Sequence, residues 1–317
     1  MRILVTGAEG FIGRALLCRL LTDMDGTDVT GLDLAVAPPW ASGDRLRWIR
    51  GGLDDRAVLE QLGAAPFDLV FHLASIPGGR AEAEPALGRR VNLDASLDLL
   101  QLLAQSRHRP RVVYASSIAV YGALSQAPVS AQTEARPAIT YGAHKRMVEI
   151  ALADHTRRGD LSGIALRLPG IVARPRPVSG FGSAFMSELL HALSAGESYV
   201  CPVSPDATAW WLSAKAAVDN LVLAGKLDVC GTLQPPALRL SIAEVVASSV
   251  QLFGTARSAG VSFAPDARIE AVFGRYPELD ASAELALGFA HDASVADMIS
   301  NAVGARIWRD KKANSPQ

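Results

Sequence analysis

The sequence predicts a doubly wound α/β fold, a parallel sheet covered by helices on both faces, with a smaller mixed α/β lobe at the C-terminal end. Over residues 1–168, short apolar runs alternate with longer segments of helical periodicity, which is the pattern of βαβ units. Two of these runs, residues 3–5 and 67–73, are apolar almost without a break, as expected for strands buried on both faces. After Pro169 the regular alternation ends.

The first strand is followed by a glycine-rich turn and an amphipathic helix. Thr6 and Gly7 end the strand, and Gly10 and Gly13 continue a three-residue repeat into the helix. Between a strand and a helix, such glycines allow a tight turn, a close approach of a pyrophosphate, and close packing of the helix. The helix N-terminus adds N–H groups and the positive end of the helix dipole. The start of the chain therefore predicts a dinucleotide-binding site.

The second strand, residues 28–34, carries Asp33 close to its end. A carboxylate at this position can accept both hydroxyls of an adenosine ribose, and it repels a 2′-phosphate. This favours NAD over NADP. Arg14 and Arg45 are cations that leave NADP open as an alternative.

The remaining elements of the N-terminal half complete the sheet. The run 67–73 is predicted to be a central strand, and the loop 74–79 after it lies at the carboxyl end of the sheet, where ligands bind in this fold class. Asn92 lies near the middle of a long helix over residues 84–105. The other predicted elements are strands at 45–50, 111–115 and 161–168, a short helix ending at residue 62, and a helix over 141–155.

The C-terminal half is predicted to form a smaller lobe over the cleft, with one strand near Thr232 returning to the main sheet. We therefore divide the chain into a dinucleotide-binding domain, residues 1–168, and a mainly substrate-binding lobe, residues 169–317. The predicted helices of this half span 182–195, 213–224, 241–253 and 292–303, and residues 310–317 form a polar tail.

Tyr141 and Lys145 are four residues apart, so they share one face of a helix. A phenol has a pKa of about 10 and is a poor base at neutral pH, but a neighbouring cation favours its ionised form. We expect Lys145, together with a positively charged nicotinamide, to lower the phenol pKa to roughly 7, which requires about 4 kcal/mol. Ser117 follows the fifth strand and can hold the substrate oxygen that Tyr141 deprotonates.

Composition excludes several classes of function. The net charge is −1 and the pI is about 6.6, so no electrostatic footprint for nucleic acid or an anionic membrane is present. No apolar run reaches membrane-spanning length, and the three cysteines are far apart, which favours a reducing, cytoplasmic setting. We expect no metal site, because His72, His144 and His155 lack partners at ligand spacing.

These motifs together resemble the extended short-chain dehydrogenases/reductases, the superfamily of NAD-dependent epimerases and dehydratases with a Rossmann sheet. The resemblance implies that Ser117, Tyr141 and Lys145 are catalytic and that Asn92 supports a water relay to Lys145. Ser117 matches the catalytic serine, and Ser116 does not. The matching segments are residues 6–13, Asp33, residues 72–74, Asn92, residues 116–122, Tyr141 and Lys145.

The resemblance also implies a set of NAD contacts. They are Gly7, Gly10, Phe11, Ile12, Gly13, Asp33, Leu53, Leu73, Ala74, Tyr141, Lys145 and Pro169. Two positions depart from the family pattern. Gly52 stands where an aspartate often contacts the adenine, so one polar contact with the cofactor is expected to be missing. Gly170 stands where nucleotide-sugar members often carry asparagine, which weakens an epimerase interpretation.

Segments 167–175 and 201–213 are similar to those of family members that oxidise small sugar acids. The expected reaction is therefore oxidation of the C2 hydroxyl of such an acid, bound between Ser117 and Tyr141. Its carboxylate needs a cation or convergent N–H groups. Arg174 is the first candidate, and Ser75 and the backbone of residues 78–79 are secondary candidates.

Three other functions are left open by this pattern: a uronate dehydrogenase, a nucleotide-sugar epimerase or dehydratase, and a dinucleotide sensor without catalysis. The presence of both Tyr141 and Lys145 argues against the sensor. Extended family members often pair through two helices, so the apolar faces around residues 94–103 and at Ile150 imply a homodimer.

Overall fold

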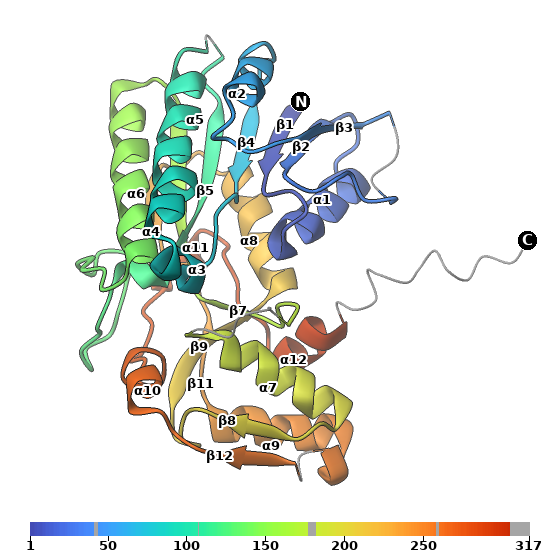
Figure 1. The fold of residues 1–317 in the computed structure, drawn as a ribbon, viewed down its shortest axis with the longest axis vertical. Helices are drawn as coiled ribbons and strands as arrows, with labels where there is room; N and C mark the ends of the chain where they lie inside the picture. Colours follow the sequence, from blue (N-terminus) through green and yellow to red (C-terminus); the bar gives the residue numbers. More distant parts are fainter. Residues whose placement is uncertain (41–43, 107, 177–181, 258–259, 305–317) are drawn as a thin grey trace, which may run out of the picture.

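The computed structural model describes residues 1–40, 44–106, 108–176, 182–257 and 260–304. A seven-stranded parallel sheet with helices on both faces forms the upper part of the molecule, and a smaller lobe with mixed strands lies below it (Figure 1). The predicted fold class is confirmed. The expected polar tail, residues 310–317, lies outside the described residues.

The strands of the main sheet follow the order β10-β6-β5-β4-β1-β2-β3, and every pairing is parallel. The chain runs from β1 outwards to β3, returns to β4 beside β1, and then runs outwards in the other direction. The carboxyl ends of β1 and β4 therefore flank the switch point, where ligands bind in open sheets. The strands are β1 (Arg2–Thr6), β2 (Asp28–Asp33), β3 (Leu46–Arg50), β4 (Leu69–His72), β5 (Arg111–Ser117), β6 (Ser162–Leu168) and β10 (Gly231–Leu233).

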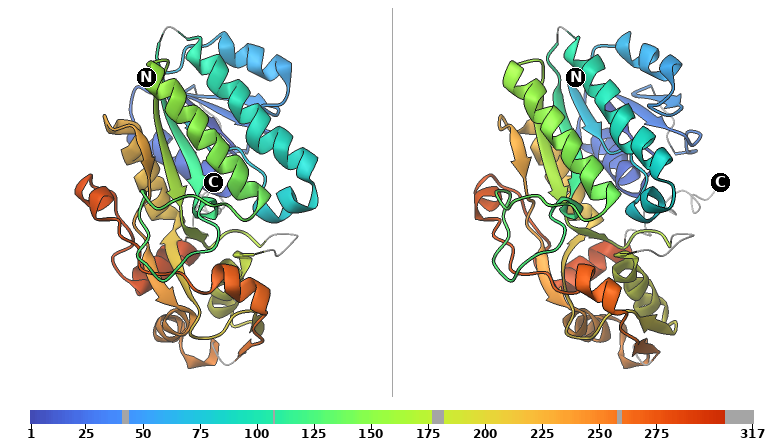
Figure 2. Two further views of the ribbon diagram at one scale, coloured as in Figure 1. Left: turned by 90° about the vertical axis from the view of Figure 1, so that its left-hand side faces the viewer. Right: turned by 60° about the vertical axis from the view of Figure 1, so that its left-hand side comes forward.

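Alternate residues of each strand face opposite layers of helices. Ile3 and Val5 pack towards α1 (Phe11–Asp23) and α8 (Ala214–Lys226), whereas Leu4 packs towards the other layer. That other layer contains α2 (Arg56–Gly63), α5 (Ala95–Ala104) and α6 (Thr140–Arg158). Figure 2 shows α5 and α6 side by side across this face of the sheet.

The segment between β4 and β5 differs from the single long helix predicted for residues 84–105. It consists of α3 (Gly78–Ala83), α4 (Pro85–Gly88), a π-helical turn (Arg89–Asp94) and α5. Pro85 starts α4, because its missing N–H and fixed φ suit a first turn and cannot continue the preceding helix. Asn92 lies in the π-helical turn, a feature that is frequent at functional sites.

The lobe has its own apolar core, which includes Trp211, Met186 and Ile299. A three-stranded sheet has the order β11-β9-β7, with β9 antiparallel to β11 and parallel to β7. The strands are β7 (Gly170–Val172), β9 (Thr208–Ser213) and β11 (Leu238–Ser241), and a separate parallel pair is β8 (Tyr199–Cys201) with β12 (Val261–Phe263). The helices of the lobe are α7 (Ala184–Ala195), α9 (Ile242–Phe253), α10 (Ala267–Phe273) and α12 (Val295–Gly304). The short helix α11 (Ser282–Ala286) lies instead beside the main sheet, and Phe289 after it joins the core around Leu16.

Two elements of the C-terminal half belong to the main sheet. Strand β10 pairs with β6, with Thr232 opposite Ala165, so the predicted return strand is confirmed. Helix α8 packs beside α1, where Val218 and Leu221 join the core around Leu16. Two 3₁₀ turns, Ile118–Val120 and Thr255–Arg257, complete the elements. Within the described ranges, no helix is both long and apolar enough to cross a membrane.

Candidate active site

A buried hydrogen-bond chain joins the carboxyl ends of β1 and β4. The Oγ1 atom of Thr6 lies 2.8 Å from Nδ1 of His72, and Nε2 of His72 lies 2.9 Å from Oγ of Ser96. The Ser96 hydroxyl donates to the carbonyl oxygen of Asn92 at 3.0 Å, so it accepts from Nε2–H of His72. Nδ1 of His72 is then the acceptor for the Thr6 hydroxyl. Burial and the nearby Lys145 lower the pKa of His72 to about 3, which keeps the ring neutral.

The Oγ1 atom of Thr6 also accepts hydrogen bonds from two backbone amides of the loop that follows β4. The N–H groups of Leu73 and Ala74 donate to it at 3.2 and 3.1 Å. The loop that follows β4 is thereby fixed against the glycine-rich turn. Leu73 and Ala74 therefore lie at the switch point, as expected for residues predicted to contact a cofactor there.

The glycine-rich turn leaves no room for side chains on its inner side. Gly7 has φ of +68°, and a Cβ atom there would lie 2.9 Å from the backbone of Ala74. A Cβ atom on Gly13 would lie 2.1 Å from the carbonyl oxygen of Gly7. Helix α1 begins at Phe11, followed by Ile12, and no side chain of the described residues caps it. A backbone cradle at the start of a 13-residue helix fits a pyrophosphate, so the residues present are suited to a dinucleotide.

Asp33 ends β2 beside this turn. Its Oδ2 atom accepts the N–H of Glu9 at 2.9 Å, and its Oδ1 atom accepts the N–H of Ala35 at 3.0 Å. These bonds fix the carboxylate, and each oxygen has a further lone pair for a ribose hydroxyl. Leu53, by contrast, is buried in the core under α2, and Pro169 joins β6 to β7.

Lys145 lies one helical turn beyond Tyr141 on α6, with its amino group in the interior. Its Nζ atom donates to the carbonyl oxygen of Ala115 at 2.7 Å, and it lies 4.7 Å from the ring centroid of Tyr114 and 5.5 Å from that of Tyr141. The residue is only 2% exposed. Burial lowers the pKa of Lys145 to about 7, although the carboxylate of Glu149 acts in the opposite direction.

The phenol of Tyr141 is surrounded by three polar side chains. Burial raises its pKa above the ordinary value, while hydrogen bonds with Ser75 and Ser117 and the positive charge of Arg174 oppose this rise. In the chain alone the phenol pKa is thus raised and not lowered; the drop towards 7 that we expect from Lys145 together with a bound nicotinamide stays a prediction. The same burial that brings Lys145 to the ring disfavours both a charged phenolate and a charged ammonium.

The two serines after β5 have different environments. The Ser116 hydroxyl is buried and donates to Oε1 of Glu149 at 2.5 Å. Ser117 is partly exposed, its Oγ atom accepts the N–H of Ala119 at 3.2 Å, and the residue lies close enough to the phenol of Tyr141 to oppose the rise in the phenol pKa. The assignment of Ser117 as the catalytic serine stays a prediction.

Asn92 contacts the loop after β4. Its Oδ1 atom accepts the N–H of Ile76 at 2.8 Å, and its Nδ2 atom donates to the carbonyl oxygen of Ile76 at 3.1 Å. Ile76 follows Ser75, which reaches the phenol of Tyr141. The contacts of the described residues thus connect Asn92 to the Ser75 loop, and the water relay from Asn92 to Lys145 stays a prediction.

Arg174 follows β7, and hydrogen bonds with two serines at the start of α7 fix its position. Its Nη2 atom donates to Oγ of Ser183 at 3.0 Å, and its N–H donates to Oγ of Ser187 at 3.0 Å. Its charge lies close enough to Tyr141 to lower the pKa of the phenol. Gly78 also packs against the side chain of Tyr141, because a Cβ atom on Gly78 would lie 3.6 Å from Cβ of Tyr141. The primary candidate for the carboxylate thus acts electrostatically on Tyr141, and one of the secondary candidates packs against the same residue.

Sequence reasoning missed a buried ion pair beneath these groups. Arg167 donates from Nε and Nη2 to the carboxylate of Glu149 at 3.0 and 2.9 Å, and the two side chains are 3% and 0% exposed. Glu149 lies four residues after Lys145 on α6. Helical spacing and the presence of an arginine in an apolar strand were the available signals.

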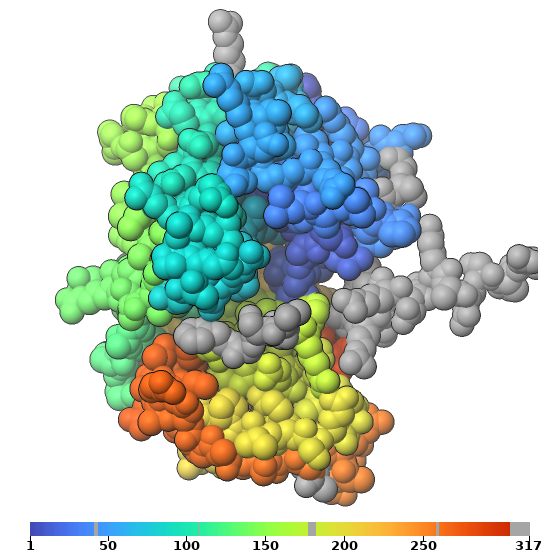
Figure 3. Space-filling model, in the orientation of Figure 1, coloured from blue at the N-terminus to red at the C-terminus, as the bar shows by residue number. Residues whose placement is uncertain are grey.

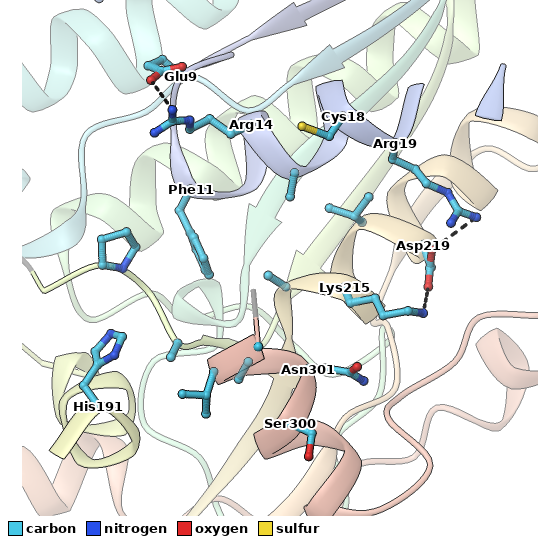
Figure 4. Close-up of a pocket in the computed structure, with 18 of the residues that line it drawn as sticks. Glu9, Phe11, Arg14, Cys18, Arg19, His191, Lys215, Asp219, Ser300 and Asn301 are labelled. Atoms are coloured by element: carbon cyan, nitrogen blue, oxygen red, sulfur yellow. Dashed lines mark hydrogen bonds and ion pairs between the residues drawn. The ribbon is translucent and has the colours of Figure 1, made fainter. Parts of the chain in front are cut away.

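A cavity of about 770 Å³ lies apart from these residues, between α1, α8, α12 and the segment after β7. Figure 4 shows Phe11 within it, the pair of Glu9 and Arg14 at its upper edge, and His191 on the side of α7. Ser117, Tyr141 and Lys145 are not among its lining residues. The molecular surface is also hollowed between the blue N-terminal elements and the teal α3 and α4 (Figure 3).

Comparison with known proteins agrees with this geometry. The model of the NAD dependent epimerase/dehydratase family matches residues 3–225. The chain is 38% identical to a D-erythronate dehydrogenase of Cupriavidus necator over 94% of its own length and 97% of the relative's, and 29% identical to one of Haemophilus influenzae over 94% and 98%. It superposes on a crystal structure described as a nucleoside-diphosphate-sugar epimerase from Agrobacterium tumefaciens with a TM-score of 0.89 and 30% identity, covering 97% and 95% of the two chains. The chain therefore belongs to the NAD-dependent epimerase/dehydratase family and is an NAD-dependent oxidoreductase.

Proposed function

We propose that this protein oxidises the C2 hydroxyl of a small sugar acid with NAD, and that the substrate is D-erythronate and the product 2-oxo-tetronate. The observation that carries this proposal is the similarity of almost the whole chain to two D-erythronate dehydrogenases, one 38% identical and the other 29%. The positive charge of Arg174, which acts on the phenol of Tyr141, adds support. A proton acceptor with a guanidinium nearby suits a substrate with a hydroxyl beside a carboxylate.

Ser117 holds the substrate oxygen, and Tyr141 takes its proton as the C2–H bond breaks. NAD, when bound, supplies the acceptor for the hydride. Lys145 has a pKa of about 7, so a substantial fraction is ammonium at neutral pH, and that form favours the phenolate of Tyr141. The proton and the hydride thus go to different acceptors, and the C2 carbon becomes a carbonyl carbon.

Arg174 binds the carboxylate of the substrate. A guanidinium has five N–H donors in a planar fork that matches a carboxylate. Ser183 engages Nη2 and so fixes the orientation of the fork. Asn92 contributes indirectly, because it holds Ile76 and with it the position of the Ser75 hydroxyl.

Two alternatives come from the same family. A uronate dehydrogenase would differ in the size of its substrate, and a nucleotide-sugar epimerase would return its hydride to the sugar without net formation of NADH. The Agrobacterium structure favours the second alternative by its description. Gly170 argues against it: a Cβ atom there would lie 2.6 Å from Cε of Met186 and 2.8 Å from the carbonyl oxygen of Trp210, so the asparagine typical of nucleotide-sugar members does not fit.

A spectrophotometric screen for NADH formation with sugar acids of four to six carbons tests the proposal. We expect D-erythronate to give the highest kcat/KM. A higher kcat/KM for a hexuronate would show that the protein is a uronate dehydrogenase. Absence of net NADH with every acid, combined with interconversion of UDP-sugars, would establish the epimerase.

We also propose that two copies pair through α5 and α6. Met147 and Ile150 on α6 are 47% and 55% exposed, so this helix presents apolar side chains to solvent. Light scattering coupled to size-exclusion chromatography measures the mass of the particle. A dimer that dissociates in Ile150→Asp is expected, and a monomeric wild type would contradict the proposal.

A further inference from the structure

Glu9 occupies the glycine-rich turn between β1 and α1, in direct contact with Asp33 and Arg14. Its N–H donates to Oδ2 of Asp33 at 2.9 Å. Its carboxylate Oε1 atom lies 3.3 Å from Nη2 of Arg14, and Figure 4 shows the two side chains pointing toward one another. The side chain of Glu9 is 19% exposed and that of Arg14 is 36% exposed. An acidic side chain is thus built into the part of the turn that touches the predicted ribose-binding carboxylate.

Arg14 is the cation that a 2′-phosphate would need at this end of the site. It follows Gly13 on α1, and its guanidinium lies 5.9 Å from the ring centroid of Trp40, in the segment after β2. The guanidinium is therefore held between Glu9 and Trp40. Arg45, the other cation considered for this role, donates from Nη2 to the carbonyl oxygen of Leu21 near the far end of α1.

The carboxylate of Glu9 is not fully paired. Its Oε2 atom is buried and has no hydrogen-bond partner among the described residues. A phosphate group carries about −1.5 to −2 charge and three acceptor oxygens, so an additional carboxylate near its binding place repels it. The negative charges of Glu9 and Asp33, which act on one another, therefore discriminate between the cofactors more strongly than Asp33 alone.

We infer that Glu9 is a second determinant of cofactor choice: it neutralises Arg14 and adds a negative charge beside Asp33, so that the site accepts NAD and rejects NADP. The inference rests on the NAD site and is independent of the substrate that is oxidised. Glu9 acts in two ways, by occupying the guanidinium that would otherwise bind the 2′-phosphate and by repelling that phosphate directly.

Isothermal titration calorimetry with NAD⁺ and NADP⁺, without any substrate, tests the inference. We expect Glu9→Gln to bind NADP⁺ more tightly than the wild type by on the order of 10-fold. This is the lower part of the range for one charged hydrogen bond, because the pair of Glu9 and Arg14 is partly exposed to solvent. Affinity for NAD⁺ is expected to stay the same or fall, so the ratio of the two dissociation constants shifts towards NADP⁺.

The double variant Glu9→Gln/Arg14→Ala separates the two actions of Glu9. Most of the gain in NADP⁺ affinity is expected to disappear in it, because the released guanidinium is gone. Unchanged NADP⁺ affinity in a Glu9→Gln protein that still binds NAD⁺ would overturn the inference. Full retention of the gain in the double variant would overturn the role of Arg14. Since no substrate is present, a failure of the D-erythronate proposal does not affect either outcome.

Discussion

Arg167 and Glu149 form a two-point hydrogen-bonded ion pair in the interior, with N···O distances of 3.0 and 2.9 Å, and this pair joins β6 to α6 directly beneath Lys145. The carboxylate also accepts the hydroxyl of Ser116, the residue before Ser117. One buried carboxylate therefore connects the three elements that carry the candidate catalytic serine, the Tyr141 helix and the segment leading to Pro169.

Glu149→Gln is expected to destabilise the protein by about 3–5 kcal/mol, because it leaves the buried charge of Arg167 without its counter-ion. Urea unfolding followed by circular dichroism measures the change. Arg146→Ala is the matched control: Arg146 also contacts Glu149, at 3.0 Å, but it is 38% exposed, so its loss should cost no more than about 1 kcal/mol. Similar stability of Glu149→Gln and wild type would contradict this prediction.

The free energy of unfolding is expected to depend on pH through Lys145. Its pKa is about 7 in the folded chain, against about 10.4 for an ordinary lysine. The unfolded state therefore binds more protons between these values, so this site contributes more stability as the pH rises from about 7 to about 10. Lys145→Met lacks this contribution. Its stability advantage over the wild type should be largest below about pH 7 and should shrink through this window. A constant difference would show that the lysine is not desolvated.

Tyr141→Phe should lose roughly 10²–10⁴-fold in kcat while it still binds NAD⁺, because only the ionisable oxygen is removed and the ring remains. Steady-state kinetics and a calorimetric titration with NAD⁺ give the two quantities. A variant that keeps more than about a tenth of wild-type kcat would require another base, and His144 on the same helix is the first residue to test.

Arg174→Ala should lower kcat/KM for the sugar acid by roughly 10- to 150-fold, which corresponds to the loss of one charged hydrogen bond to the carboxylate. The affinity for NAD⁺ should stay near that of the wild type. Arg174→Lys should recover little, since an ammonium lacks the planar fork. Arg176→Ala provides a control two residues away, because Arg176 is exposed and paired with Glu197. An equal loss in both alanine variants would show that general charge near the cleft, and not Arg174, recognises the acid.

Features encoded by short-range spacing could be predicted from the sequence. The repeat of Gly7, Gly10 and Gly13, the strand-end Asp33 and the spacing of Tyr141 and Lys145 each lie within one turn or one element. They are found in the elements where they were expected, and the parallel α/β fold class follows from the alternation of apolar runs and helical segments. The return of the chain to the main sheet near Thr232 was also visible as an isolated strand pattern.

Contacts between distant parts of the chain could not be predicted in the same way. Thr6 meets His72, Asn92 meets Ile76, and Arg167 meets Glu149 only after the sheet has assembled. The sign of the change in the Tyr141 pKa depends on how deeply the ring is buried, and burial is a property of packing. The π-helical turn likewise has no signal in apolar periodicity, so one long helix was expected where the chain forms several short ones.

The return of α8 and β10 to the main sheet has a consequence for protein engineering. A fragment that stops at Leu168 would lack Val218 and Leu221, which cover part of the apolar surface around Leu16, and it would leave β6 as an open edge. Such an edge recruits strands from other molecules. The C-terminal half is therefore not a unit that can be exchanged whole. A chimera that borrows the lobe of a relative has to retain the native α8 and β10, and each of its junctions has to fall in a segment where the chain passes between the two cores.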